Sequence, residues 1–282
     1  MGEAVRWTQS RLQQAGSTSA RLDAELLVAR AVGRDRSWLY AHGDHLLGSE
    51  SRGLLERLVV RRMRLEPMAY ILGSREFMGL DLKVESSVLV PRPETEILVE
   101  AALNWAHRQD RELWAADVGS GSGCIAVSLA FHLRQLKVVA IDVSAAALAM
   151  VRINVARHRL SERVLPVRGD LLSPLAGAVN LVCANLPYLS AAQIDGLGGE
   201  VAAHEPHSAL FGGPTGLELN SRLLRQARVH LRAPWAIYLE MDPSQGQALA
   251  EIARRHYPDA TIAVLDDLAS RPRCLEIRHD QC

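Results

Sequence analysis

The chain has 282 residues, of which 48% are hydrophobic, and its 32 basic side chains equal its 32 acidic ones. A formal charge of zero argues against broad electrostatic capture of nucleic acid, and no run of about eighteen apolar residues is present to span a membrane. Four cysteines lie at scattered positions without the C-x-x-C spacing of a metal site, which indicates reduced thiols: Cys124, Cys183, Cys274 and Cys282.

The first 66 residues have the apolar periodicity of short helices, and they lack the apolar core of a signal peptide. Helical patterns cover residues 5–14, 19–31 and 51–65, with Ser19 as the expected N-cap of the second. We therefore expect a small helical bundle and a cytoplasmic location.

Four arginines lie near the end of the third predicted helix: Arg57, Arg61, Arg62 and Arg64. One interpretation is a local basic patch. The interpretation that we favour is a solvated helix face whose cations complement the helix dipole. Only a basic patch would give the protein an anionic partner.

Residues 67 to about 90 alternate between apolar and polar side chains in the manner of a β-hairpin, with Gly79 near the turn. Pro91 and Pro93 end this pattern. Glu94 then opens a helix over residues 95–107.

Beyond that helix, strand patterns alternate with helical ones, at 114–118, 137–141, 164–167, 179–184 and 235–240. This alternation predicts a parallel, doubly wound α/β sheet. Two further strand patterns, at 261–265 and 274–278, have no helix between them, which predicts a closing antiparallel pair.

A glycine-rich loop at residues 119–123 follows the first of these strands and precedes a helical pattern. Glycine allows a tight turn and a close approach to a ligand. The dinucleotide fingerprint would place its third glycine where the chain has Cys124, and no P-loop pattern occurs, so NAD, FAD and P-loop nucleotides are disfavoured. Asp142 ends the next strand, where a carboxylate can accept both hydroxyls of a ribose. The alternative is an ordinary glycine turn and a structural acid.

The most informative stretch is Asn185-Leu186-Pro187-Tyr188, which follows the buried-strand pattern of residues 181–184. In an open α/β sheet, residues at the carboxyl end of a strand lie where ligands bind. The Asn185 oxygen and the next backbone carbonyl can accept the two hydrogens of a planar nitrogen and steady the charge that develops as it is methylated. Proline orients the backbone, and the aromatic ring can stack on the planar group. The alternative is a simple turn, since Asn and Pro are common turn residues.

With these motifs the chain resembles the enzymes that methylate the N(5) nitrogen of a glutamine in peptide chain release factors. The similarity runs from residue 67 to 100 and includes the R-P-E-T-E signature of that family at Arg92–Glu96. It continues downstream through Glu200-Val201, Glu205-Pro206, Ala209-Leu210, Gly213 and Gly216-Leu217.

Several positions depart from the family pattern. Leu186 replaces the commoner Pro, which gives a tetrapeptide that is also found in ribosomal RNA adenine dimethyltransferases. Met241-Asp242 follow Glu240 in place of the usual Ile-Gly, and Asn220 replaces a usual Tyr, although Gln245 is retained. These differences affect the expected substrate more than the class of reaction.

The resemblance implies an α/β fold, with a Rossmann-like seven-stranded methyltransferase sheet and a small helical domain before it. It divides the chain into a partner-docking helical bundle at residues 1–66, a β-hairpin linker at 67–93 and a methyltransferase domain at 94–282. The expected partners are peptide chain release factors. No metal, no membrane and no direct nucleic-acid binding are expected.

The resemblance also implies S-adenosyl-L-methionine as the methyl donor. The loop Gly119-Ser120-Gly121-Ser122-Gly123 would pass beneath its methionine part, and Asp142 would take the ribose. Asp170 would accept from the adenine amino group and Leu171 would cover the ring, with a turn or N-cap acid as the alternative for Asp170. Thr95 and Asn185 would also reach the cofactor.

In this interpretation Asn185, Leu186, Pro187 and Tyr188 hold the glutamine of the release factor GGQ motif in line with the methyl group. The main alternative is an adenine amino-methyltransferase acting on RNA or DNA, which would use the same tetrapeptide. A non-catalytic cofactor-binding protein is a third hypothesis. The segment 189–220 is the longest irregular stretch and is interpreted as a substrate-facing flap, with a plain surface loop as the alternative.

Overall fold

The computed structural model describes residues 1–196 and 198–280, so the predicted thiol of Cys282 lies outside the described residues. The chain divides into two compact units. The first joins residues 1–74 to the short segment 198–204, and the second comprises the rest of the chain. The boundaries that the resemblance implies, near residues 66 and 93, stay a prediction.

The first unit is a bundle of short helices. They are α1 (Gly2–Gln14), α2 (Ala20–Val32), α3 (Arg36–Ala41), α4 (Ser49–Met63), α5 (Met68–Leu72) and α10 (Gly199–His204). Leu12, Leu27 and Leu55 are fully buried between the first, second and fourth of these helices, as the apolar periodicity predicts. Helix α3 was not predicted, although Asp35 caps it by accepting a hydrogen bond from the Trp38 amide at 2.7 Å.

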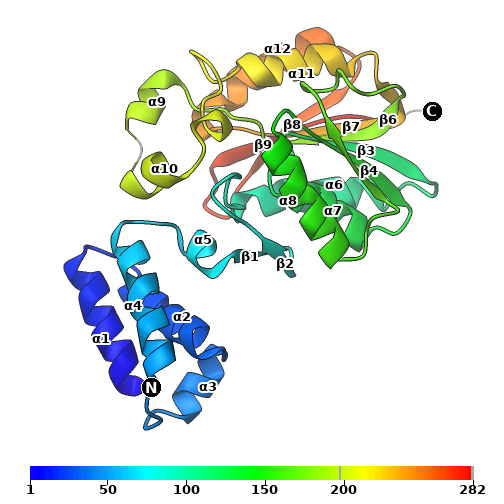
Figure 1. Ribbon diagram of the computed structural model, residues 1–282. Coiled ribbons are helices and arrows are strands. Elements are labelled where there is room, and N and C mark those ends of the chain that lie inside the picture. The colour runs from blue at the N-terminus through cyan, green and yellow to red at the C-terminus, as the bar shows by residue number, and fades with distance from the viewer. Residues whose placement is uncertain (197, 281–282) are drawn as a thin grey trace. The chain divides into compact units, whose positions relative to one another are not determined.

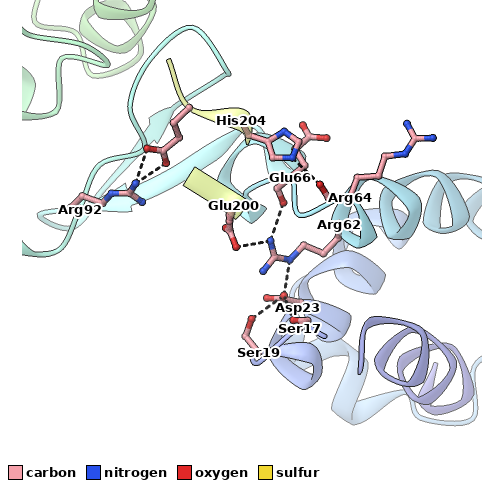
Figure 2. Close-up of polar contacts among 10 residues, drawn as sticks. Ser17, Ser19, Asp23, Arg62, Arg64, Glu66, Arg92, Glu200 and His204 are labelled. Carbon is pink, nitrogen blue, oxygen red and sulfur yellow. Dashed lines mark hydrogen bonds and ion pairs between the residues drawn. The ribbon is translucent and has the colours of Figure 1, made fainter. Parts of the chain in front are cut away.

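The arginines at the end of α4 form a solvated face only in part, because Arg57 and Arg64 are exposed whereas Arg62 is not. Arg62 is buried and forms an ion pair with Asp23 of α2, with an Nε–Oδ2 distance of 2.8 Å. Its guanidinium also contacts Glu200 of α10 at 3.1 Å, as Figure 2 shows. Arg61 pairs with Glu66. Carboxylates therefore neutralise two of the four predicted cations, because burying a charge without a partner is costly.

The predicted hairpin at 67–90 is shorter than its alternating pattern. Residues 68–72 form α5, because the apolar Ala69, Tyr70 and Ile71 are all buried and Gly73 ends the helix in the left-handed region at φ +79°. Only β1 (Ser74–Phe77) and β2 (Leu80–Lys83) pair, as a two-stranded sheet whose turn contains Gly79.

The second unit contains a seven-stranded sheet with the order β5-β4-β3-β6-β7-β9-β8. The strands are β3 (Leu113–Val118), β4 (Leu136–Asp142), β5 (Val164–Arg168), β6 (Val179–Ala184), β7 (Leu231–Glu240), β8 (Thr261–Asp266) and β9 (Pro272–His279). Strands β3 to β7 run parallel, and β9 pairs antiparallel with β7 and β8. The predicted α/β architecture is confirmed.

Helices cover both faces of this sheet (Figure 1). Helices α6 (Glu94–Ala106), α7 (Cys124–His132) and α8 (Ala145–Arg157) pack on one face, and α11 (Glu218–Ala227) and α12 (Gly246–His256) pack on the other. Neighbouring residues such as Ala115 and Ala116 enter opposite cores, so the strands are continuous apolar runs. No helix in the described part of the chain is long and apolar enough to cross a membrane.

The segment 189–220 has more regular structure than was predicted. It contains α9 (Ala191–Asp195), α10 and a turn of 3₁₀ helix at His207–Ala209. Ser190 and Gln193 form a capping box at the start of α9. Because α10 belongs to the first unit, this segment is not one loop, and its role as a flap stays a prediction.

Candidate active site

The candidate site lies at the carboxyl ends of the parallel strands, where the chain order reverses. From β3 the chain continues to β4 and β5 on one side, and it then returns to β6 on the other side. Val118 pairs in register with both Ile141 and Ala184, so the residues that follow these three positions meet at one edge. Ligands bind at such switch points in open α/β sheets.

Among the residues that the structure describes, all but two of the predicted site residues line a cavity at this edge of the sheet. Those in the lining are Thr95, Gly119, Ser120, Gly121, Ser122, Asp142, Asp170, Leu171, Asn185, Leu186 and Pro187. Gly123 is instead the N-cap of α7, and Tyr188 is not in the lining. The fold therefore brings together residues that are up to 92 positions apart in the sequence, from Thr95 to Pro187.

The glycine loop is shaped by its contacts with β4. The Gly119 amide donates to the Ile141 carbonyl at 2.8 Å, and the Gly121 amide donates to the Asp142 carboxylate at 2.9 Å. The other carboxylate oxygen accepts from the Ser144 amide at 2.8 Å. Asp142 therefore organises the loop as well as facing the cavity.

Gly119 cannot be replaced by a larger residue without rearrangement. Its φ is +74°, and an added Cβ would lie 2.8 Å from Cδ2 of Leu186. The side chain of Leu186 is buried and packs against the loop from the tetrapeptide side. Leu186, which replaces the family's Pro, therefore provides a direct contact between the tetrapeptide and the glycine loop.

Asp117, which sequence reasoning missed, lies buried beneath the loop. One of its oxygens accepts from the Ala126 amide at 3.1 Å, whereas Oδ1 has no hydrogen-bond partner among the described residues. Burial raises the pKa of this carboxyl to about 7. The only sequence signal was its place as the next-to-last residue of β3, two positions before the glycine loop.

We expect Asp117→Asn to change how stability depends on pH. Because the folded pKa of Asp117 is about 7 and its ordinary value is 3.8, its favourable contribution is full below about pH 4 and is lost as the pH rises to about 7. Over this range the wild type should lose up to about 1.4 kcal/mol of unfolding free energy per pH unit relative to the variant. Urea unfolding of both proteins at several pH values measures this difference, and a constant difference would contradict the assignment.

Asp170 and Leu171 follow β5 at the same edge. Asp170 forms an ion pair through Oδ2 with Arg222 of α11, and its side chain is half exposed at the cavity. Leu171 is buried, with a positive φ of +53°, and belongs to the core beneath the cavity. Their roles toward adenine stay predictions.

The tetrapeptide after β6 is joined to two other elements by a chain of hydrogen bonds. Asn185 donates from Nδ2 to the Thr95 hydroxyl at 3.0 Å, and Thr95 donates to Oε2 of Glu240 at 2.6 Å. The Tyr188 hydroxyl donates to the other oxygen of Glu240 at 3.2 Å. Glu240, at the end of β7, is 1% exposed, and burial raises its pKa. Sequence reasoning placed Glu240 in a family pattern but gave it no role.

The backbone of Tyr188 is enclosed from behind. Gln245 donates from Nε2 to the Tyr188 carbonyl at 2.8 Å. A Cβ added to Gly216 would lie 2.1 Å from that carbonyl oxygen, and one added to Gly212 would lie 2.4 Å from the Pro187 oxygen. These glycines allow the chain to pass close to the tetrapeptide.

Two further segments contribute to the lining of the cavity, residues 87–92 and the group Pro206, Ser208 and Ala209. Arg92 of the signature, at the left of Figure 2, donates from Nη2 to both carboxylate oxygens of Glu205, at 2.7 and 2.8 Å. Glu205 is buried, and this ion pair connects the two segments of the lining. No cluster of metal-binding side chains is found among the described residues.

Comparisons with known proteins cover almost the whole chain. A family model described as "PrmC N-terminal domain" matches residues 3–73, and one described as "Methyltransferase small domain" matches residues 94–203. A release factor glutamine methyltransferase of Moorella thermoacetica is 39% identical over 97% of this chain and 95% of its own length. The enzyme of that name from Rhodopirellula baltica is 36% identical over 97% and 94%.

A solved structure shares the fold at low identity. A methyltransferase from Pyrococcus furiosus is 18% identical, with a TM-score of 0.54, and the match covers 72% of this chain and 90% of that one.

Proposed function

Because the chain belongs to the family of release factor glutamine methyltransferases, we propose that it transfers a methyl group from S-adenosylmethionine to the glutamine side chain of the GGQ motif in peptide chain release factors. The observation that carries this proposal is the position of Asn185. Asn185 lies in the cavity wall next to the glycine loop, and its side-chain nitrogen donates a hydrogen bond to the Thr95 hydroxyl.

The residues of the cavity fit the proposed cofactor. Gly119 and Gly121 allow the backbone to approach a ligand closely, because both have positive φ angles and lack a Cβ. The carboxylate of Asp142 accepts one backbone amide on each oxygen, and each oxygen keeps a lone pair for a ribose hydroxyl. When bound, S-adenosylmethionine supplies a methyl group that is already activated on a sulfonium.

The chemical task of the protein is then to hold the acceptor. An amide nitrogen is a weak nucleophile because its lone pair is delocalised. The Asn185 oxygen and the Leu186 carbonyl are proposed to accept its two hydrogens, which orients the nitrogen and stabilises the positive charge of the transition state. Tyr188 is proposed to support the amide plane, and its hydroxyl is held by Glu240.

Membership of the family also suggests roles for the two parts of the chain that precede the methyltransferase domain. We infer that the helical residues 1–66 dock the release factor and that residues 67–93 link them to the methyltransferase domain at 94–282. A translation factor as substrate would place the enzyme in the cytoplasm.

Mass spectrometry tests the proposed function directly. The purified protein is incubated with S-adenosylmethionine and either a release factor or an adenine-containing RNA, and the products are digested and analysed. We expect one added methyl group on the GGQ glutamine and none on the RNA. Methylation of the RNA alone would overturn the substrate and favour the adenine enzyme, whose tetrapeptide has the same form.

Cofactor affinity tests the role of Asp142. Asp142→Ala should weaken S-adenosylmethionine binding by about tenfold or more, because two charge-assisted hydrogen bonds to the ribose are lost and the loop loses its anchor at Gly121. Calorimetry measures the change, with Asp110→Ala as a control at an exposed acid far from the cavity lining. Equal cofactor affinities of the two variants would contradict the proposed role of Asp142 in binding the ribose.

A further inference from the structure

Glu240 is a buried carboxylate next to the tetrapeptide and outside the cavity lining, as far as the structure describes the chain. A buried carboxylate is costly unless hydrogen bonds compensate for its lost hydration. Here hydroxyl groups from two other elements supply them, Thr95 from α6 and Tyr188 from the tetrapeptide. Arg273 of β9 adds a favourable charge, while burial raises the pKa of Glu240.

The order of donors and acceptors in this network follows from chemistry. The Thr95 hydroxyl has a single hydrogen, and it donates this hydrogen to Oε2 of Glu240 at an oxygen–oxygen distance of 2.6 Å. The lone pairs of the same hydroxyl are then left to accept. The group opposite them at 3.0 Å must donate, and of the two ends of the Asn185 amide only Nδ2 can do so.

The two ends of an asparagine amide have the same shape but opposite hydrogen-bonding character. If Asn185 turned over, Oδ1 would face the lone pairs of Thr95 and the amide hydrogens would face the cavity. A substrate nitrogen that carries hydrogens would then meet a donor where it needs an acceptor. The activity that we propose therefore depends on which way this one amide points.

We propose that Glu240 is a positioning residue that acts through Thr95 to hold the Asn185 amide with Oδ1 available to the substrate nitrogen. This inference rests on the proposed function and adds to it a specific task for Thr95 and Glu240. Thr95 orients the acceptor, and Glu240 sets the direction of the Thr95 hydroxyl. Tyr188, on the other carboxylate oxygen, fixes the position of Glu240 itself.

A double-mutant cycle tests this route of action. Thr95→Val keeps the shape of the side chain and removes the hydroxyl, and Thr95→Ser restores the hydroxyl. With a release factor and saturating S-adenosylmethionine, Thr95→Val should lower the single-turnover rate by about tenfold or more, and Thr95→Ser should recover most of that loss. In an Asn185→Ala background, Thr95→Val should change the rate by less than about twofold, because the group through which it acts is gone.

Glu240→Gln provides a second cycle if Thr95→Val folds poorly. It should also slow the wild-type enzyme and have little further effect beside Asn185→Ala. Losses that multiply fully in the double variants would overturn the inference, because Thr95 and Glu240 would then act independently of Asn185. A methyl transfer rate that is equally low for Thr95→Val and Thr95→Ser would also overturn it.

A measurement without substrate separates this inference from the proposed function. The side-chain NH₂ signals of Asn185 are assigned in ¹⁵N spectra by their loss in Asn185→Ala. Their exchange with solvent should be slow in the wild type, faster in Thr95→Val and Glu240→Gln, and slow again in Thr95→Ser. If the wild type fails to methylate any release factor but this pattern holds, the proposed function fails and the positioning role stands. Unchanged exchange in Thr95→Val and Glu240→Gln would overturn the positioning role whatever the substrate is.

Discussion

Replacing Asn185 with alanine should lower kcat for glutamine methylation by about a hundredfold or more and leave cofactor affinity nearly unchanged. The contact is strongest when positive charge develops on the substrate nitrogen, so its loss affects the transition state more than the bound ground state. The glycine loop and Asp142, which are proposed to hold the cofactor, do not depend on the Asn185 side chain for their hydrogen bonds. Single-turnover methyl transfer and calorimetry measure the two quantities.

The matched control is Asn104→Ala, at an exposed asparagine on the solvent side of α6. It removes the same atoms at a position that is not in the cavity lining and should change neither quantity. Full-rate transfer by Asn185→Ala would contradict the proposed role of its side chain. A loss of cofactor affinity that accounts for the whole decrease in rate would show that the Asn185 side chain binds the cofactor and not the substrate.

The parallel sheet was predictable because it is buried on both faces. Its strands are short apolar runs such as residues 179–184, and each is separated from the next by a helical pattern. Helices α3 and α5 were missed for the opposite reason. They are only six and five residues long, too short to show a helical period, and α5 is a short apolar run just before a strand.

The two main motifs of the site were predictable because each is continuous in the sequence. The loop at 119–123 and the tetrapeptide at 185–188 both follow a strand, and parallel strands bring their carboxyl ends to one edge. The hydrogen-bond network was not predictable in this way. Glu240 lies 145 positions from Thr95, and no local pattern indicates which buried hydroxyl its carboxylate contacts.

Asp170 and Arg62 show a second limit of sequence reasoning. Each was interpreted from its own position, at a strand end or a helix end. In the structure each side chain is paired with a charge from a distant segment, Arg222 for Asp170 and Asp23 for Arg62. Charge pairing over such separations is decided by packing, whereas the positions of Gly119 and Asn185 are decided by the strand before them.

Gly216→Ala should destabilise the protein and greatly reduce methyl transfer. At φ +77° an alanine is strained, and its Cβ would lie 2.1 Å from the Tyr188 carbonyl oxygen and 2.5 Å from Nε2 of Gln245. The added methyl group therefore disrupts the hydrogen bond that holds the tetrapeptide from behind. We expect the unfolding free energy to fall by about 3 kcal/mol and the melting temperature to fall by roughly 5–10 °C.

Gly177→Ala is the matched control, because Gly177 is exposed and a Cβ there would meet nothing within 4 Å. That variant should melt within about 2 °C of the wild type, since an alanine at a compatible position changes stability by less than about 1 kcal/mol. In the folded Gly216→Ala protein the loss should appear in kcat rather than in cofactor affinity, because the displaced carbonyl belongs to the tetrapeptide and not to the glycine loop. Thermal unfolding and single-turnover transfer, both measured below the melting temperature of the variant, distinguish these effects. If Gly216→Ala melts and turns over like Gly177→Ala, the close packing of this glycine against Tyr188 does not support the tetrapeptide.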